Sequence, residues 1–227
     1  MSQVVAVDLF CGVGGLTHGL TLEGIRVAAG IDVDGACRHP YETNNAARFM
    51  ERDVSRVTAA EINRLLAPAE VRVLAGCAPC QPFSTYSQRY ETVGTPRWGL
   101  LYEFARLVKG VRPHLVTMEN VPTVGKHQVF RDFVAALEKL GYRVWHDVVD
   151  CARYGLPQRR RRMVLLASRE GRIDLIAPTH EHPKTVREAI GSLPKISAGG
   201  TWEKDPMHTA SVLSKLNLER IRASRPG

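Results

Sequence analysis

The feature that most constrains the fold of this chain is a regular alternation of two kinds of segment over its first 168 residues. Short apolar runs rich in β-branched residues alternate with longer stretches whose apolar residues have a helical period. Strands are predicted at 4–10, 26–32, 71–77, 115–120, 142–150 and 162–168, and helices near 15–23, 35–47, 58–67, 100–110 and 128–140. Strands that alternate with helices form a parallel sheet with crossover helices, so the sequence predicts an open, doubly wound α/β sheet.

Composition narrows the classes of protein to which such a sheet can belong. The 227 residues carry 31 Lys and Arg against 23 Asp and Glu. The net charge of +8 favours a polyanionic partner such as nucleic acid, with a merely basic soluble protein as the alternative. No apolar run approaches the roughly 20 residues of a membrane helix, and the first residues lack a signal-peptide pattern, so we expect a soluble, cytoplasmic protein without a membrane partner. Its five cysteines are an odd number in a chain of ordinary size, which indicates reduced thiols.

Small and acidic residues gather where the first strands are predicted to end. The segment DLFCGVGG (8–15) has three glycines at a strand-to-helix turn, where glycine permits a tight bend and close approach of the backbone to a ligand. Asp32 ends the second strand and suits the two hydroxyls of a ribose, with Asp34 as a rival. Asp53 closes the next unit and can accept a hydrogen bond from an adenine amino group. Each acid taken singly is more often a helix cap or a surface residue, but together they predict a site shaped for adenosine.

The segment CAPCQP (77–82) raises the question of why a cysteine is held at such a bend. Cys77 and Cys80 have a spacing that zinc or redox chemistry can use. A second pair of ligands is missing from the sequence, because the nearest candidate, HEH at 180–182, is interpreted as a polar loop. A single activated thiolate at Cys80 fits better, and no metal is expected.

Two further groups lie near the same predicted edge. Glu119 ends the neighbouring strand, where a carboxylate can act as an acid or hydrogen-bond donor. A run of four arginines precedes the last strand of the sheet. Strand alternation sends Arg160 and Arg162 to one face and the other two to the opposite face, so one pair can meet phosphate or base while the other stays solvated.

These residues together resemble the DNA (cytosine-5) methyltransferase family, whose motifs match DLFCGVGG, APCQPFS, ENV and QRRRR in this order. The resemblance spans roughly residues 4–168, and TVREAIGSLP (185–194) resembles the family's continuation. It implies a Rossmann-like, mostly parallel sheet whose last strand hairpin runs antiparallel, and S-adenosyl-L-methionine as the methyl donor. It also implies a role in DNA methylation, with a restriction-modification system as the expected setting.

The resemblance gives roles to single positions of this chain. It implies that Cys80 is the nucleophile and Glu119 the acid, and that Arg160 and Arg162 hold the target base and its backbone. The cofactor-binding residues that it implies are Phe10, Gly12, Gly14, Gly15, Asp32, Val33, Asp53, Val54, Pro79 and Leu100. The substrate-binding residues expected with them are Gln81, Ser84, Asn120 and Gln158. Asp32 stands where the family usually has Glu, so the cofactor affinity is expected to be modest.

These residue types suit methyl transfer to cytosine. Carbon 5 of cytosine is a poor nucleophile, but a thiolate that adds to carbon 6, with Glu119 stabilising protonated N3, makes carbon 5 reactive toward a sulfonium methyl group. Such a base is out of reach inside a duplex, so the expected substrate is double-stranded DNA with a flipped-out cytosine. Residues 81–99 resemble the family's mobile loop that closes over that base.

The chain divides into a catalytic and cofactor-binding domain, residues 1–170, and an extension, residues 171–227. The extension has no convincing strand and one plausible helix at 211–222. Family enzymes continue into a target recognition domain and a final motif, neither of which is found here, so we expect a fragment or a chain completed by a second chain. Two alternatives are an RNA-directed member of the family and a non-catalytic module that binds nucleic acid or a partner methyltransferase.

Overall fold

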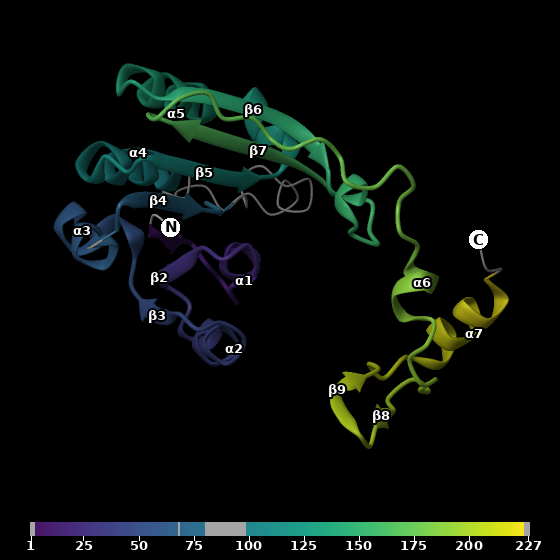
Figure 1. Ribbon diagram of the computed structural model, residues 1–227. Coiled ribbons are helices and arrows are strands. Elements are labelled where there is room, and N and C mark those ends of the chain that lie inside the picture. Colours follow the sequence, from purple (N-terminus) through teal and green to yellow (C-terminus); the bar gives the residue numbers. More distant parts are fainter. Residues whose placement is uncertain (1–2, 68, 80–98, 225–227) are drawn as a thin grey trace.

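The computed structural model describes residues 3–67, 69–79 and 99–224, which form a seven-stranded sheet with helices on both faces and a projecting C-terminal segment (Figure 1). The strands are β1 (Val4–Leu9), β2 (Arg26–Asp32), β3 (Arg48–Glu51), β4 (Val71–Gly76), β5 (Leu115–Asn120), β6 (Arg143–Asp150) and β7 (Arg161–Ser168). Their order is β3-β2-β1-β4-β5-β7-β6; the first five pair in parallel, whereas β7 runs antiparallel to both β5 and β6. The predicted doubly wound, mostly parallel fold is therefore confirmed, together with its antiparallel hairpin.

Side-chain alternation along β1 divides the core between the two faces of the sheet. The helices are α1 (Gly15–Leu22), α2 (Arg38–Asn44), α3 (Ala59–Leu66), α4 (Leu100–Val111) and α5 (Gln128–Lys139). Val5, Val7 and Leu9 belong to the large cluster formed with α3, α4 and α5, whereas Ala6 packs with Leu20 of α1. Both faces are thus covered, as a parallel sheet requires. Within the described residues, none of the helices combines the length and the apolar character needed to cross a membrane.

The sequence prediction is wrong at one edge of the sheet. No strand is predicted where β3 pairs with β2. The helix predicted at 35–47 is a 3-10 turn, η1 (Gly35–Cys37), followed by α2, and its predicted end runs almost into β3. The four residues of β3 hold one apolar pair between charged ends, which is too short for an alternating pattern to be recognised.

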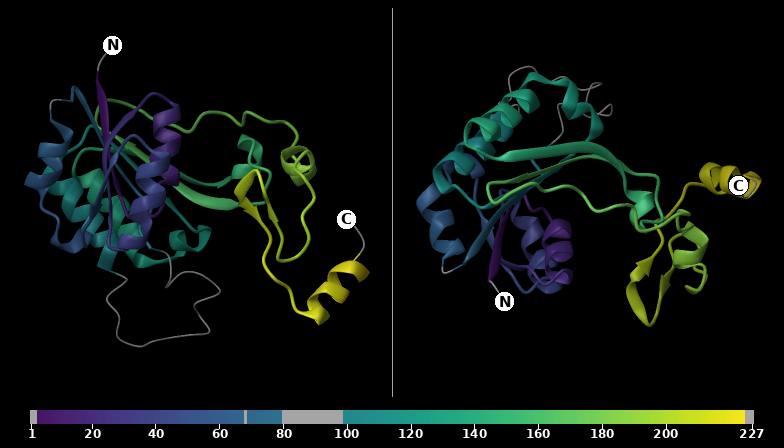
Figure 2. Two further views of the ribbon diagram at one scale, coloured as in Figure 1. Left: turned by 90° about the horizontal axis from the view of Figure 1, so that it is seen from below. Right: turned by 45° about the horizontal axis from the view of Figure 1, so that its top comes forward.

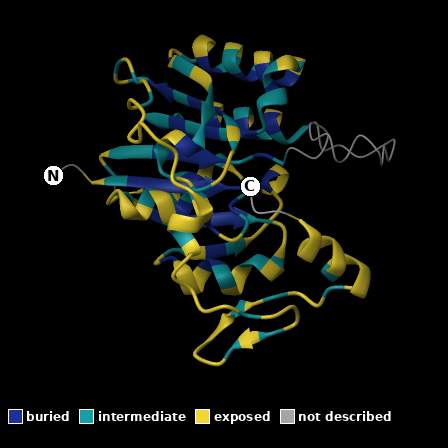
Figure 3. Cartoon of the chain, turned by 90° about the vertical axis from the view of Figure 1, so that its right-hand side faces the viewer, coloured by how far each residue is buried: buried dark blue, intermediate teal, exposed yellow. Residues whose placement is uncertain are grey.

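The segment after the sheet, residues 171–224, is called the C-terminal arm. Its first part runs back along the hairpin of β6 and β7, and the rest projects away from the sheet (Figure 2). It contains α6 (Val186–Ile190), β8 (Thr201–Trp202), β9 (Asp205–Thr209) and α7 (Lys215–Ala223). The prediction of no strand here is wrong, since β8 and β9 pair antiparallel, whereas α7 overlaps the helix predicted at 211–222. No residue of the C-terminal arm is buried (Figure 3).

The C-terminal arm is attached where it passes the turn between β6 and β7. The Tyr154 hydroxyl, at the end of η7 (Cys151–Tyr154), donates to the Ile176 carbonyl at 2.8 Å. The His180 N–H donates to the Arg153 carbonyl at 3.0 Å. The root of the arm is therefore held by backbone and hydroxyl groups, not by a shared apolar core.

Candidate functional site

The ends of several strands converge on one cavity of about 220 Å³. β1 and β4 are the neighbours at which the strand order reverses, which is where open α/β sheets bind ligands. The cavity is lined by Phe10, Asp32, Val33, Arg52, Asp53, Val54, Pro79 and Leu100. Seven of these eight residues are among those for which the sequence predicts cofactor contacts, and Arg52 is the additional one. The structure thus brings together residues from five separate segments, while their contact with a cofactor stays a prediction.

The turn between β1 and α1 has an unusual backbone. Phe10, Gly12 and Gly14 have φ angles of 57°, 50° and 92°, in the left-handed region that favours glycine. At Gly14 a Cβ atom would lie 2.5 Å from Nδ2 of Asn45 and 2.8 Å from the ring of Tyr41, so only glycine fits. At Gly12 a Cβ atom would meet no described atom within 4 Å, so packing does not exclude a side chain there. None of the predicted glycines 12, 14 and 15 is among the residues that line the cavity.

Asp32 is the acid that the fold brings to the cavity. Its Oδ2 accepts the Gly12 N–H at 2.9 Å, and its Oδ1 accepts the Asp34 N–H at 3.0 Å. The rival, Asp34, accepts the Ala36 N–H instead and caps η1. Two backbone donors therefore fix the Asp32 carboxylate at the cavity, and each oxygen keeps accepting capacity for another group.

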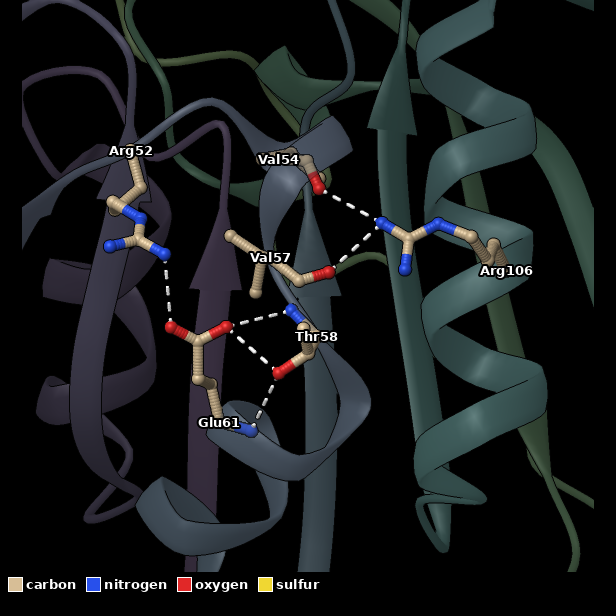
Figure 4. Close-up of polar contacts among 6 residues, drawn as sticks. All are labelled: Arg52, Val54, Val57, Thr58, Glu61 and Arg106. Atoms are coloured by element: carbon tan, nitrogen blue, oxygen red, sulfur yellow. Dashed lines mark hydrogen bonds and ion pairs between the residues drawn. The ribbon is translucent and has the colours of Figure 1, made fainter.

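Asp53 and Val54 form the wall of the cavity that follows β3. Oδ1 of Asp53 accepts the Ser55 N–H at 2.9 Å, and this bond holds the pKa of Asp53 below its ordinary value. Val54 is buried and begins the 3-10 turn η2 (Val54–Arg56). The neighbouring Arg52 pairs with Glu61 at 3.1 Å (Figure 4). This wall therefore offers an ionised acceptor beside an apolar surface.

A second group of predicted residues meets at the end of β5. Oε1 of Glu119 lies 2.7 Å from Nε of Arg162 and 3.9 Å from a terminal nitrogen of Arg160. The ladder pairs Glu119 with Val164 of β7, so arginines two and four residues before Val164 can reach it. The other two arginines of the run are exposed. Three of the four residues predicted as catalytic therefore form one cluster of charged side chains.

Asn120, predicted to contact substrate, is buried and serves the protein's own backbone. Its Nδ2 donates to the Ala78 carbonyl at 3.1 Å, and its Oδ1 accepts the Val121 N–H at 2.9 Å. Asn120 thus fastens the segment that leads to Pro79 onto the strand that carries Glu119.

The remaining predicted residues differ in what the structure says of them. Gln158 is exposed, and its role stays a prediction. Burial raises the pKa of the Cys77 thiol, and the nearby Glu119 carboxylate adds to the rise, so Cys77 is a neutral thiol. The nucleophile and two substrate contacts predicted from the sequence, Cys80, Gln81 and Ser84, lie outside the described residues.

A buried polar network beneath the glycine turn escapes the sequence analysis. Thr17 Oγ1 donates to Oδ2 of Asp8 at 2.8 Å and lies 3.0 Å from the Tyr41 hydroxyl. Because Thr17 has one hydroxyl proton, the Tyr41 hydroxyl is the donor in the second bond. Oδ1 of Asp8 has no partner among the described residues, and burial raises the pKa of Asp8 to about 7. The sequence signal that could have indicated this network is an acid, Asp8, inside the otherwise apolar run VVAVDLF.

Comparison with known proteins agrees with the motifs and with the fold. The family model described as C-5 cytosine-specific DNA methylase matches residues 4–226. The Type II methylase M.HgiDII of Herpetosiphon aurantiacus is 51% identical over 226 residues, which cover 97% of this chain and 63% of that protein. The Type II methyltransferase M.XorII of Xanthomonas oryzae is 33% identical over 90% of this chain and 50% of its own length.

Solved structures support the same architecture. A DNA modification methyltransferase encoded within an E. coli prophage has a TM-score of 0.71 at 24% identity, and the match covers 89% of this chain and 58% of that one. The matches thus cover between half and two thirds of the length of these three proteins. Because the family model matches nearly all of its residues, the chain belongs to the C-5 cytosine-specific DNA methylase family.

Proposed function

We propose that this chain carries the catalytic residues for transfer of a methyl group from S-adenosyl-L-methionine to carbon 5 of a flipped-out cytosine in double-stranded DNA. The observation that carries the proposal is that the cavity and the charged cluster both lie at the carboxyl ends of the parallel strands. Asn120 joins the two, because it lies next to Glu119 and bonds the Ala78 carbonyl beside the cavity-lining Pro79. Family membership agrees with this chemistry.

The cavity residues fit an adenosine-containing cofactor. Asp32 offers carboxylate oxygens to the ribose hydroxyls, and Asp53 offers one to the adenine amino group. Phe10, Val54 and Leu100 supply apolar walls for a flat base. When bound, the cofactor supplies an activated methyl group with a neutral thioether as the leaving group.

The side chains of this chain prepare the cytosine. The Cys80 thiolate adds to carbon 6, and Glu119 hydrogen-bonds to N3 and stabilises its protonated form, which makes carbon 5 nucleophilic. Arg162 fixes the carboxylate of Glu119 through the 2.7 Å contact. After carbon 5 has gained the methyl group, a base removes its proton and the bond to Cys80 breaks, which restores the aromatic ring.

The C-terminal arm supports the proposal that a further protein segment completes the enzyme. It leaves eight large apolar side chains exposed: Ile176, Val186, Ile190, Leu193, Met207, Val212, Leu216 and Ile221. Relatives of this chain are longer than the part it matches. We infer that a segment carrying target recognition, on a second chain or on the same one, covers this surface.

The test is transfer of labelled methyl groups to duplex DNA of mixed sequence, with 5-methylcytosine identified in the digested product. The chain is assayed alone and with the portion of M.HgiDII that lies outside the matched region. Glu119→Gln is expected to lower the rate roughly 10²–10⁴-fold, and Cys80→Ser to abolish transfer, whereas Glu138→Gln, on the exposed side of α5, leaves it unchanged. Transfer to RNA alone, or no transfer in either preparation, would contradict the proposal.

A further inference from the structure

Arg106 joins two parts of the cavity wall that are about fifty residues apart in sequence. One terminal nitrogen of its guanidinium, Nη2, lies 3.1 Å from the Val54 carbonyl, 3.3 Å from that of Ser55 and 3.0 Å from that of Val57, so its two N–H groups are shared among three acceptors. A second nitrogen of the same group bonds the Glu103 carboxylate one turn earlier on α4. Figure 4 shows the guanidinium facing the backbone of the turn that follows Asp53.

Two of these carbonyls need a donor from outside the turn. η2 has only three residues, and its closing bond, from the Val57 N–H to the Val54 carbonyl at 3.2 Å, leaves the Ser55 and Val57 carbonyls without a partner inside it. A guanidinium carries five N–H donors in a fixed planar fork, and a charged donor forms stronger bonds than a neutral one. Arg106 therefore fixes the backbone of the segment that presents Asp53 and Val54 to the cavity.

The same segment is held from its other side by α3. Oε1 of Glu61 pairs with Arg52, while its Oε2 accepts the Thr58 N–H at 2.9 Å and the Thr58 hydroxyl at 2.8 Å. The chain from Arg52 to Thr58 is thus fixed near both ends by Glu61, and its middle is fixed by Arg106 (Figure 4). Arg106 links this segment to α4 by hydrogen bonds, in addition to the apolar packing of Val54 and Val57 in the cluster that includes α4. Leu100, the first residue of α4, also lines the cavity.

We propose that Arg106 is a positioning residue for the nucleoside end of the cofactor. It sets the separation between the wall formed by Asp53 and Val54 and the wall formed by Leu100, without touching the cofactor itself. This inference rests on the proposed function, because it assigns the cavity to S-adenosyl-L-methionine.

Arg169 supplies a matched control within the same chain. Its guanidinium also bonds two backbone carbonyls, of Pro113 at 3.0 Å and Arg112 at 2.7 Å. It follows the last residue of β7, which pairs with the first residue of β5. Arg169 therefore lies at the amino ends of the parallel strands, whereas the cavity lies at their carboxyl ends. Loss of Arg169 therefore reports the general effect of removing an arginine that bonds carbonyls.

The experiment compares Arg106→Met, Arg106→Lys and Arg169→Met in the full chain. Calorimetry measures the Kd of S-adenosyl-L-methionine, and hydrogen exchange without cofactor follows the amides of Ser55 and Val57. Arg106→Met is expected to raise Kd about tenfold and to speed exchange at both amides; Arg106→Lys restores part of each effect. Arg169→Met is expected to leave the Kd and the two exchange rates within twofold of those of the parent chain. Its loss of thermal stability is expected to be comparable to that of Arg106→Met.

Two outcomes separate failure of the inference from failure of the proposed function. Unchanged Kd and exchange in Arg106→Met, or equal changes in Arg169→Met, would overturn the positioning role while cofactor binding by the parent chain stands. If the parent chain binds no S-adenosyl-L-methionine even with the outside portion of M.HgiDII present, the proposed function falls, and this inference falls with it.

Discussion

The sheet and the C-terminal arm contain the same helix-starting motif, but they bury very different amounts of apolar surface. Thr58 with Glu61 begins α3, and Thr185 with Glu188 begins α6, each through a complete capping box. In α3 the apolar residues Ile62 and Leu66 are fully buried. The large apolar residues of α6 are not buried: Val186 and Ile190 are 57% and 53% exposed.

This difference teaches that a local sequence signal sets where a helix begins, whereas packing determines whether the helix is stable. A capping residue contributes about 1 kcal/mol, but a buried side chain adds about 1.5–3 kcal/mol. The sheet has its own core, and the C-terminal arm does not. The arm is therefore expected to be much less stable than the sheet.

Hydrogen exchange provides the widest test of this comparison. Amides of β1, β4 and β5 are expected to exchange through global unfolding, whereas amides of α7 exchange through local opening, so their rates should differ by at least about 10³-fold. Adding the portion of M.HgiDII outside the matched region is expected to slow exchange in the arm. Equal protection of α7 and β4 in the isolated chain would contradict the account.

Truncation of one apolar side chain in each region sharpens the comparison. Phe104 is fully buried and its ring centroid lies 5.2 Å from that of Phe133, so Phe104→Ala is expected to cost about 3–5 kcal/mol of unfolding free energy. Ile221 of α7 is largely exposed, so Ile221→Ala is expected to cost less than about 0.5 kcal/mol. Denaturant unfolding measures both; a loss above about 2 kcal/mol for Ile221→Ala would show that the arm does have a core.

Because Asp8 is buried in the sheet, the unfolding free energy is expected to depend on pH, and no such dependence is expected from the exposed acids of the arm. Asp8 has a pKa of about 7 in the folded chain, above its ordinary 3.8, so the folded state holds this proton more tightly than the unfolded chain. Stability is therefore expected to fall as pH rises from about 4 to about 7. Asp8→Asn should remove this loss, which amounts to at most roughly 4 kcal/mol.

The control for that prediction is Asp174→Asn, which removes an acid of the arm that pairs with Arg172 at the surface. Its unfolding free energy is expected to follow that of the parent chain at every pH. Parallel pH profiles for the parent chain and Asp8→Asn would contradict the role assigned to the buried carboxyl group.

An effect smaller than those of Phe104→Ala and Asp8→Asn is expected at the root of the arm. Tyr154→Phe removes the hydroxyl that bonds the Ile176 carbonyl, and one hydrogen bond of this kind is worth about 1 kcal/mol. Exchange of the amides near His180 should rise while the midpoint of global unfolding stays unchanged. A shift in that midpoint as large as that of Phe104→Ala would mean that the root belongs to the core.

Much of the sheet could be predicted because the determining signals are local, whereas most of the cavity residues, such as Phe10, Pro79 and Leu100, came from the family resemblance. β2 and β5 begin and end at the predicted residues, since apolar runs bounded by polar turns mark them. Asp32 and Asp53 could be chosen because acids at strand ends are few. The ion pair of Glu119 with Arg162 follows from strand alternation once β5 and β7 are neighbours.

Other features depend on contacts that no local pattern records. Arg106 resembles any arginine on a helix surface until the fold places three carbonyls beside it. Gly14 resembles a ligand-binding glycine, although the ring of Tyr41 is what excludes a side chain there. The β8–β9 hairpin pairs across a short connection without an apolar face, so its sequence gives no strand pattern.

The central proposal is that Cys80 of this chain is an active nucleophile that acts together with Glu119, and covalent trapping tests it most directly. The chain, together with the portion of M.HgiDII outside the matched region, is incubated with S-adenosyl-L-methionine and duplex DNA that contains 5-fluorocytosine. A base cannot remove fluorine from carbon 5 as it removes the proton, so the bond to Cys80 does not break. A denaturation-resistant adduct with DNA is therefore predicted for the parent chain, and no adduct for Cys80→Ser. An equal yield of adduct from Cys80→Ser, or no adduct from the parent chain, would contradict the account.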